Sequence, residues 1–501
     1  MPTYETLSHR HQEYSEKVLC ELQDLFAGGY RMLAQAAKYL HRLPCESDAS
    51  HETRLKIGYL NFLAGIVGHY SSRLFEAGIH VVPPPDAANP ATPGTSPVPE
   101  YYEAFGRDAD RCGNPFETIL SEAIEEALVY QRAYLCVDMP SLSATPTSRA
   151  DDEIEPYLYS IPIEQVINWK IGENGKFEWV VLEYAIANQD DPLVVPTTYA
   201  LGWKVWKLVD GHAEWDAYRS RDLNVNCRLD KNESIARVDH GVTDFSEIPI
   251  LLLKLPNKLW IGNKVGPLCL EHHQRRSALS MSASKSCVSI PAVFLGSEMP
   301  QPSKMVSEVQ QDPGRGNRSP VNEFERRGFT TFGSDDRLEF VSPDTAGYEF
   351  VKSDLEALRV DIYRTVWQMA QSLGDSSSRT RNSGESKRED GKPEVKMLKA
   401  LATYVRKFAV QIYTLIDTVR GGDTKWVVHG LDGYEDEDRD TLLSEAQALG
   451  NIPIPSPTFQ QLYKFDVARK LCAMDAQTSE IVRQEIVDGV VAEATIAAQV
   501  H

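Results

Sequence analysis

The segment 374–392, GDSSSRTRNSGESKREDGK, combines several cations with no apolar side chain, a composition that can make weak contacts with phosphate groups. Its charged side chains are Arg379, Arg381, Lys387, Arg388 and Lys392 against Asp375, Glu385, Glu389 and Asp390. Such cations can contact phosphates without reading bases. A segment close to neutral would hold nucleic acid weakly and release it as salt rises. A lone mixed-charge loop is more often simply solvated, so composition alone leaves both interpretations open.

Two other stretches could suggest a metal site, and neither has the required spacing. His272 and His273 are adjacent, so on a helix their side chains point about 100° apart and do not face one ion. We expect them to make packing and polar contacts between helices. The acidic run is Asp432, Glu435, Asp436, Glu437, Asp438 and Asp440. It lacks the alternating spacing of an EF-hand loop, which favours a solvated acidic surface.

The sequence also lacks the motifs of nucleotide binding and of nucleophilic catalysis. GENGK (172–176) resembles part of a phosphate-binding loop, but Lys170 stands where that motif needs glycine and Phe177 where it needs Ser or Thr. No Ser-His-Asp or Cys-His set can be assembled from the sequence. We therefore predict a protein that is not an enzyme and has no cofactor and no bound metal.

Composition excludes further classes. The formal net charge of −20 disfavours binding of nucleic acid through a broadly basic surface. The eight cysteines are scattered without a C-x-x-C pair, which is typical of reduced thiols. No run of about 18 apolar residues exists, and the polar N-terminus lacks the apolar core of a signal peptide, so we expect no membrane association.

The elements around these residues indicate an α+β protein of several parts. In 59–78 the residues Leu60, Leu63, Val67, Tyr70 and Leu74 repeat at helical spacing. The prolines of 83–99 forbid regular structure there. Asn114 is placed to cap a helix that leads into an apolar strand at Tyr134–Val137. A β-rich region follows, with a hairpin predicted at Asn174-Gly175.

The second half contains the longest helical patterns. Residues 264–287 are helical in pattern and rich in Ser and Ala, and further helices are predicted before the charged segment and from Pro393 onward. The last of these carries its apolar stripe at Leu398, Leu401, Val405, Phe408, Ile412, Leu415 and Val419. Two short strands, IPAVFLG (290–296) and RLEFVSP (337–343), should pair with each other or with a neighbouring subunit, because unpaired edges are unfavourable.

The order of these stretches resembles that of tailed-bacteriophage portal proteins, the rings at a capsid vertex through which DNA enters and leaves. The similarity covers roughly residues 55–420. It rests on YLNFLAGIVGHYSSRLFEAGIHVVPP, FETILSEAIEEALVYQRAYLCVDMP, PYLYSIPIEQVINWKI, EIPILLLKLPNKLWIGNKVGPLCLEHHQRRSALSMSASKSCVSIPAVFLG and LEFVSPDTAGYEFVKSDLEALRVDIYRTVWQMAQSL. The chain departs from the family in its Pro-rich segment 83–99 and in the sequence between the two short strands.

The resemblance implies the portal fold, with a helical stem and crown, a mixed α/β wing and a small β-containing clip. The implied parts are a wing (1–263), a first stem helix (264–288), a clip (289–345), a second stem helix (346–373), a tunnel loop (374–392), a long wing helix with a short strand (393–430) and crown-like C-terminal helices (431–501).

The resemblance also implies a function in the virion. The chain would form a homo-oligomeric ring, with twelve subunits in the family, and conduct double-stranded DNA during packaging and ejection. Its partners would be the large terminase packaging motor, the major capsid protein and a head-tail adaptor protein, first in the host cytoplasm and then at the portal vertex. The five cations of 374–392 would face DNA, and the clip would present a docking surface at Arg315, Arg318, Glu323, Arg326 and Arg327.

Two alternatives remain open from the sequence. The chain could be another ring-forming adaptor of the virion. It could also be an α+β enzyme with a mobile lid at 374–392. The size of the native particle separates these functions, since a portal forms a large ring and an enzyme usually a small closed oligomer.

Overall fold

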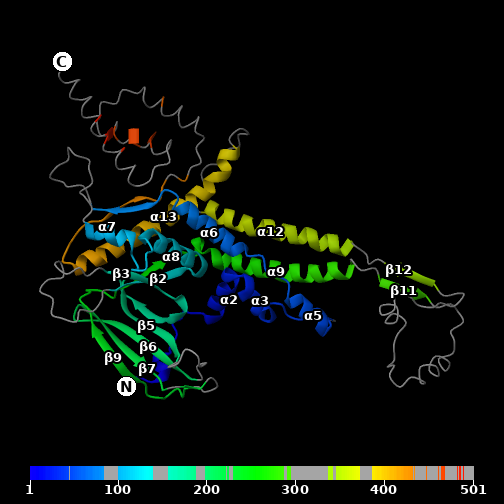
Figure 1. Cartoon of the computed structure of the whole chain (residues 1–501), viewed down its shortest axis with the longest axis horizontal. Coiled ribbons are helices and arrows are strands. Elements are labelled where there is room, and N and C mark those ends of the chain that lie inside the picture. The colour runs from blue at the N-terminus through cyan, green and yellow to red at the C-terminus, as the bar shows by residue number, and fades with distance from the viewer. Residues whose placement is uncertain are drawn as a thin grey trace. The chain divides into compact units, whose positions relative to one another are not determined.

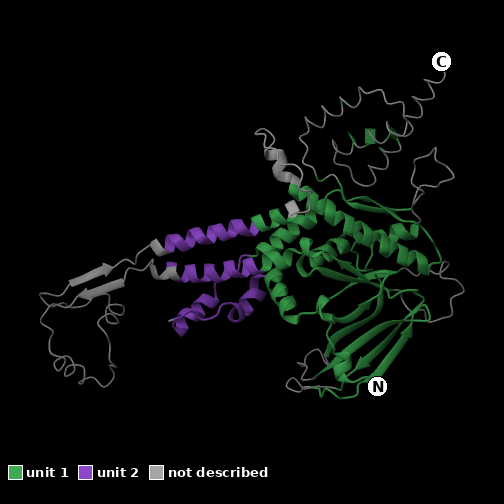
Figure 2. Cartoon of the chain, turned by 180° about the vertical axis from the view of Figure 1, so that it is seen from behind, with its two compact units in different colours: residues 1–27, 61–266, 364–501 green, residues 28–60, 267–363 purple. Residues whose placement is uncertain are grey.

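The computed structural model describes most of the first 434 residues in two compact units (Figure 2). The described ranges are 1–44, 46–83, 100–138, 156–187, 198–221, 223–224, 229–286, 290–294, 337–341, 346–372, 386–432 and 434, with isolated positions between 447 and 489. Unit 1 comprises residues 1–27, 61–266 and 364–501, and unit 2 comprises residues 28–60 and 267–363. Both helices and antiparallel sheets are present, so the predicted α+β class is confirmed.

Several helices lie wholly in unit 1, and the longest of them is α13. They are α1 (Tyr4–Leu7), α2 (Glu16–Ala27), α6 (Phe62–Leu74), α7 (Glu100–Arg107), α8 (Phe116–Tyr130) and α13 (Ser386–Val419). The predicted stripe of α13 is buried from Leu398 to Leu415, and α13 packs on α6 and α8. In α6 the predicted stripe is buried except for Leu60, which precedes the helix and is exposed.

The strands of unit 1 form antiparallel sheets. They are β1 (Ile79–Val82), β2 (Arg132–Asp138), β3 (Tyr157–Ile161), β4 (Val166–Ile171), β5 (Phe177–Ala187), β6 (Thr198–Val209), β7 (His212–Arg219), β8 (Leu223–Asn224), β9 (Ala236–Val242), β10 (Ile250–Lys254) and β13 (Val427–Gly430). One sheet has the order β10-β2-β3, a larger sheet has the order β4-β5-β6-β7-β9 with β8 beside β6, and β1 pairs with β13. The predicted turn joins β4 to β5, and Gly175 adopts the left-handed φ of +77° that such a turn needs.

The core of unit 1 is apolar and rich in aromatic side chains. Helix α8 covers the three-stranded sheet and buries Leu120, Ile124 and Leu128. Tyr102 stands against the Trp426 ring with centroids 4.5 Å apart, and its hydroxyl donates to the buried Asp417 carboxylate at 2.6 Å. These contacts fix α7 to the end of α13, which lies in the same core.

Unit 2 consists of short helices, most of two long helices and a pair of strands. Its elements are α3 (Gly29–Ala34), α4 (Ala36–Tyr39), α5 (Asp48–Leu55), α9 (Ile261–Ser286), β11 (Ile290–Phe294), β12 (Arg337–Val341) and α12 (Ala346–Ser372). The first six residues of α9 and the last nine of α12 belong to unit 1. Helices α9 and α12 lie side by side in both views (Figures 1 and 2).

The strands β11 and β12 pair with each other, which is one of the two pairings that the sequence left open. Their register runs antiparallel from Ile290 opposite Val341 to Phe294 opposite Arg337. The two flanking helices begin and end within three residues of the predicted stem helices 264–288 and 346–373. The segment between the strands lies outside the described residues. Among the helices that the structure describes, none is long and apolar enough to span a lipid bilayer.

Candidate functional site

The last part of the predicted phosphate-contacting segment differs from the prediction. Helix α12 stops at Ser372, but α13 starts at Ser386 and continues through Pro393, where the sequence predicted its first residue. Lys387, Arg388 and Lys392 therefore lie on the first turns of α13 and not in a loop. Proline suits a helix start but does not define one, and the polar residues before it extend the helix.

The other predicted site residues fall in parts of the chain that the structure does not describe. These are Arg379 and Arg381 of the tunnel segment, the clip residues Arg315, Arg318, Glu323, Arg326 and Arg327, and most of the acidic run after Asp432. Their predicted roles remain predictions. Within the described ranges, no group of three or more His, Cys, Asp or Glu side chains is arranged to hold a metal ion, and Cys20, Cys112, Cys136 and Cys269 are not in disulfides.

Residues 274–276 of α9 make polar contacts with α12 and with residues 28–60. Arg275 forms ion pairs with Asp354 of α12 and with Glu271 one turn earlier on α9. The next residue, Arg276, donates to the Gly58 carbonyl at 2.9 Å. Gln274 donates to the Tyr39 carbonyl at 3.0 Å. Residues 274–276 thus bind α9 to α12 on one side and to segment 28–60 on the other.

A buried ion pair anchors segment 28–60. The Arg54 guanidinium is 2% exposed and donates to both carboxylate oxygens of Glu46, at 2.8 and 2.9 Å. It also donates to the His41 carbonyl and to the Ser277 hydroxyl of α9. The Arg54 hydrogen bond, helped by the Leu43 N–H, lowers the pKa of Glu46 to about 2. A bidentate pair with its remaining donors satisfied offsets the cost of burying charge, so it holds this segment in one arrangement.

The two adjacent histidines point to different neighbours, as helix geometry predicts. The His272 ring is buried near Glu356 and Arg359 of α12, so it contributes to the expected contact between the long helices. The His273 ring instead meets the Tyr59 ring edge-on with centroids 5.5 Å apart. Burial, followed by the charge of Arg276, lowers the pKa of His273 to about 4. Both rings serve packing.

One face of α12 leaves large apolar side chains exposed. Val360 is 54% exposed and Tyr363 is 50% exposed, one helical turn apart. Val360 lies on the opposite side of α12 from the buried Leu358 and Ile362, because the helix repeats every 3.6 residues, and Tyr363 lies between that side and Ile362. Phe350, earlier on α12, is also exposed. Unit 2 therefore presents apolar side chains that the rest of the unit does not cover.

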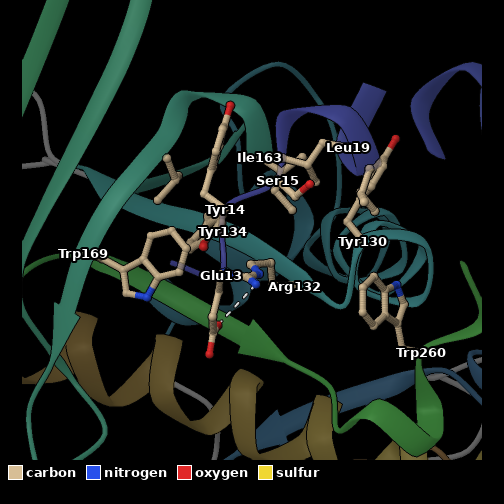
Figure 3. Close-up of a pocket in the computed structure, with 12 residues that line it drawn as sticks. Glu13, Tyr14, Ser15, Leu19, Tyr130, Arg132, Tyr134, Ile163, Trp169 and Trp260 are labelled. Carbon is tan, nitrogen blue, oxygen red and sulfur yellow. Dashed lines mark ion pairs between the residues drawn. The ribbon is translucent and has the colours of Figure 1, made fainter. Parts of the chain in front are cut away.

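A second feature, in unit 1, was missed by the sequence reading: an aromatic cavity of about 110 Å³ (Figure 3). Its lining residues are Glu13, Tyr14, Ser15, Val18, Leu19, Tyr130, Arg132, Tyr134, Ile163, Val166, Trp169 and Trp260. In Figure 3 the Arg132 side chain lies between Trp169 and Trp260, and a dashed line marks its ion pair with Glu13. Because these residues come from many separate elements, no local spacing pattern could have brought them together.

Comparisons with known proteins give the following similarities. No protein-family model and no curated protein matches the chain. Among solved structures, a chain of "Virion of native gene transfer agent (GTA) particle" matches with a TM-score of 0.41 and 11% identity, covering 90% of this chain and 94% of that chain. A chain of "Neck of empty GTA particle computed with C6 symmetry" matches with a TM-score of 0.40 and 12% identity, covering 81% and 90% respectively. At these TM-scores the fold class rests on the chain's own elements.

Proposed function

We propose that this chain is the subunit of a portal-type ring at one vertex of a phage-like capsid, a structural protein and not an enzyme. The observation that carries the proposal is the exposed apolar face of α12. Val360 and Tyr363 lie on a long helix whose opposite face is already buried, so a neighbouring molecule is the natural cover for them. In a closed ring each subunit presents one such face to the next.

The arrangement of the chain around α12 supports the same function. Two long helices flank a pair of short antiparallel strands, in the order that the portal resemblance implies for stem, clip and stem. Each helix spans roughly 40 Å at 1.5 Å per residue. Helices of that length, linked by ion pairs such as Arg275–Asp354, suit the wall of a channel.

In this proposal the parts have the following roles. The ring conducts double-stranded DNA during packaging and ejection, and the cations between α12 and the first turns of α13 make weak phosphate contacts. The segment between β11 and β12, with Arg315, Arg318, Glu323, Arg326 and Arg327, docks the packaging motor and later the head-tail adaptor. The major capsid protein surrounds the ring.

Native mass spectrometry and end-on negative-stain images test the proposal. The expected particle has about twelve times the 56.1 kDa mass of one chain and a central hole. Comparing the particle mass at low and at physiological salt shows whether charge repulsion limits assembly, since each subunit carries a formal charge of −20. A particle no larger than a dimer at physiological salt would contradict the ring.

A further inference from the structure

The aromatic cavity of unit 1 lies beside a larger groove, and together they form a two-part surface. The groove has a volume of about 710 Å³ and shares Glu13, Arg132 and Trp260 with the cavity. We propose that this surface binds an acidic peptide segment of a partner protein, with one apolar side chain of that segment inserted in the cavity. The proposal concerns unit 1 alone and does not depend on ring assembly.

The cavity has the size and walls to hold one apolar side chain. An engineered cavity of about 150 Å³ binds benzene, so about 110 Å³ suits a single ring or a branched aliphatic group. Tyr134, Val166 and Trp169 in its walls are buried and therefore fixed. At the rim, Val18 is 42% exposed and adds apolar surface for the inserted group.

Two of the aromatic walls are held in place by contacts outside the cavity. The His11 ring stacks on Trp169 with centroids 4.0 Å apart. The Trp260 indole donates to the Val129 carbonyl at 2.8 Å. A preformed pocket loses little conformational entropy when it binds, so a small anchor can contribute a useful share of the affinity.

The charges at the mouth favour an acidic partner. Three charged side chains line the two spaces, and Arg132 and Lys254 outnumber Glu13. Lys254 Nζ lies 3.0 Å from Glu13 Oε2, and an Arg132 nitrogen lies 3.3 Å from the same oxygen. Arg132 is only 11% exposed and stands over the Trp169 ring, so it contributes positive charge and few accessible donors. Lys254 is 41% exposed, and Glu13 uses only part of its three donors. A carboxylate of the partner can accept the remaining N–H groups in charge-assisted hydrogen bonds.

The groove explains why the ligand is a peptide and not a free aromatic acid. It is lined by hydrogen-bonding side chains, among them Gln131, Asn257 and Tyr404, and by Leu255 and Pro256. Gln131 adopts a left-handed φ of +73° and donates to Asn257 Oδ1 at 2.6 Å, which fixes this wall. A small acid would fill only the cavity, whereas a peptide places its anchor in the cavity and its backbone along the groove.

Three acetylated and amidated tripeptides test the proposal with the full-length chain by isothermal titration calorimetry. The sequence Asp-Phe-Asp should bind at least tenfold more tightly than Lys-Phe-Lys, which reverses the charge, and than Asp-Ala-Asp, which lacks the anchor. Its affinity should fall as salt is raised from 50 to 500 mM, because salt screens the attraction between exposed charges. Equal binding of the three peptides, or no binding of any, would overturn the proposal. So would 3-phenylpropanoate that binds as tightly as Asp-Phe-Asp, because that result indicates a site for small acids.

Variants locate the binding on this surface. Ser15→Trp places a large ring at the exposed start of α2 and should block the cavity without removing a buried contact. Arg132→Met removes a charge but keeps an apolar stem. Each should weaken Asp-Phe-Asp binding by tenfold or more. Lys170→Met, next to Trp169 on β4 with its exposed side chain paired to Glu178, is the matched control and should bind normally. Unchanged binding in Ser15→Trp, with the fold intact by circular dichroism, would overturn the assignment.

Discussion

At the scale of single residues, His273 couples the stability of unit 2 to pH. Its ring is 1% exposed, and burial lowers its pKa to about 4 from the ordinary 6.5. The unfolded chain therefore binds a proton at this residue between pH 6.5 and 4, while the folded chain does not. The contribution of the neutral ring to stability is complete above pH 6.5 and is lost as pH falls towards 4.

Replacing the titrating ring with a neutral one should reduce this dependence. In His273→Phe the aromatic contact with Tyr59 remains possible, and the fall in unfolding free energy between pH 6.5 and 4.5 should be smaller than in the parent. The difference is bounded by about 1.4 kcal/mol per pH unit for one proton. Urea denaturation at three pH values measures it, with His212→Gln at the exposed start of β7 as control. Equal slopes for the parent and His273→Phe would show that His273 does not carry the effect.

Two helical glycines should respond to alanine in opposite directions. A Cβ on Gly262, at the start of α9, would lie 2.0 Å from the Val129 carbonyl oxygen of α8. A Cβ on Gly68, within α6, would meet nothing within 4 Å. Gly262→Ala should therefore lower the unfolding free energy by about 1–3 kcal/mol. Gly68→Ala should raise it by roughly 0.5–1 kcal/mol, the helix preference of alanine. Stabilisation by both substitutions, measured by thermal melting, would contradict the close approach of α9 to α8.

At the scale of elements, the sequence predicted what depends on local spacing. The apolar stripe of α13 and the turn at Asn174-Gly175 follow from periodicity and turn chemistry, and both are present. Long, strongly periodic helices are the most predictable elements because many residues repeat the same signal.

Element ends were less predictable, because the side chains that favour a start have other partners in the fold. Asn114 was expected to cap α8, but Pro115 occupies the N-cap and the Asn114 amide donates to Asp110 at 2.6 Å. Glu117 accepts from the Ile79 N–H of β1, a contact that no local pattern encodes. The aromatic cavity was missed for the same reason, since tertiary packing alone assembles it.

The exposed face of α12 gives an element-scale test of the ring. Val360→Glu combined with Tyr363→Glu should move the native mass distribution from the ring towards the single chain, because like charges replace apolar contacts between subunits. The melting temperature of the isolated subunit should change little, since both side chains are exposed. Val238→Glu on β9 is a matched control, because Val238 is similarly exposed but lies on another element. Normal rings from the double variant would contradict the proposed interface.

At the scale of the whole molecule, the negative net charge affects both the assembly of the proposed ring and the passage of DNA through it. Subunits of charge −20 repel one another unless opposite charges meet at their contacts. The same acidic character would repel a DNA duplex from all sides of a channel and lower friction along it. The proposed ring therefore needs a small set of cations if it is to hold packaged DNA at all, and the charged segment between α12 and α13 supplies them.

Replacing Arg379, Arg381, Lys387 and Arg388 with Ser tests that role. Rings should still form, because no apolar contact is lost, while retention of packaged DNA should weaken as phosphate contacts disappear. The two pairs of cations can be tested separately. Lys387 and Arg388 lie on the first turn of α13, and Arg379 and Arg381 precede that helix in the sequence. Each double variant should show a smaller loss than the fourfold variant, and the parent should show the same loss as salt rises. The measurement is the fraction of DNA retained in filled particles across a salt series. If the fourfold variant fills and retains DNA normally at every salt concentration, these cations do not contact DNA.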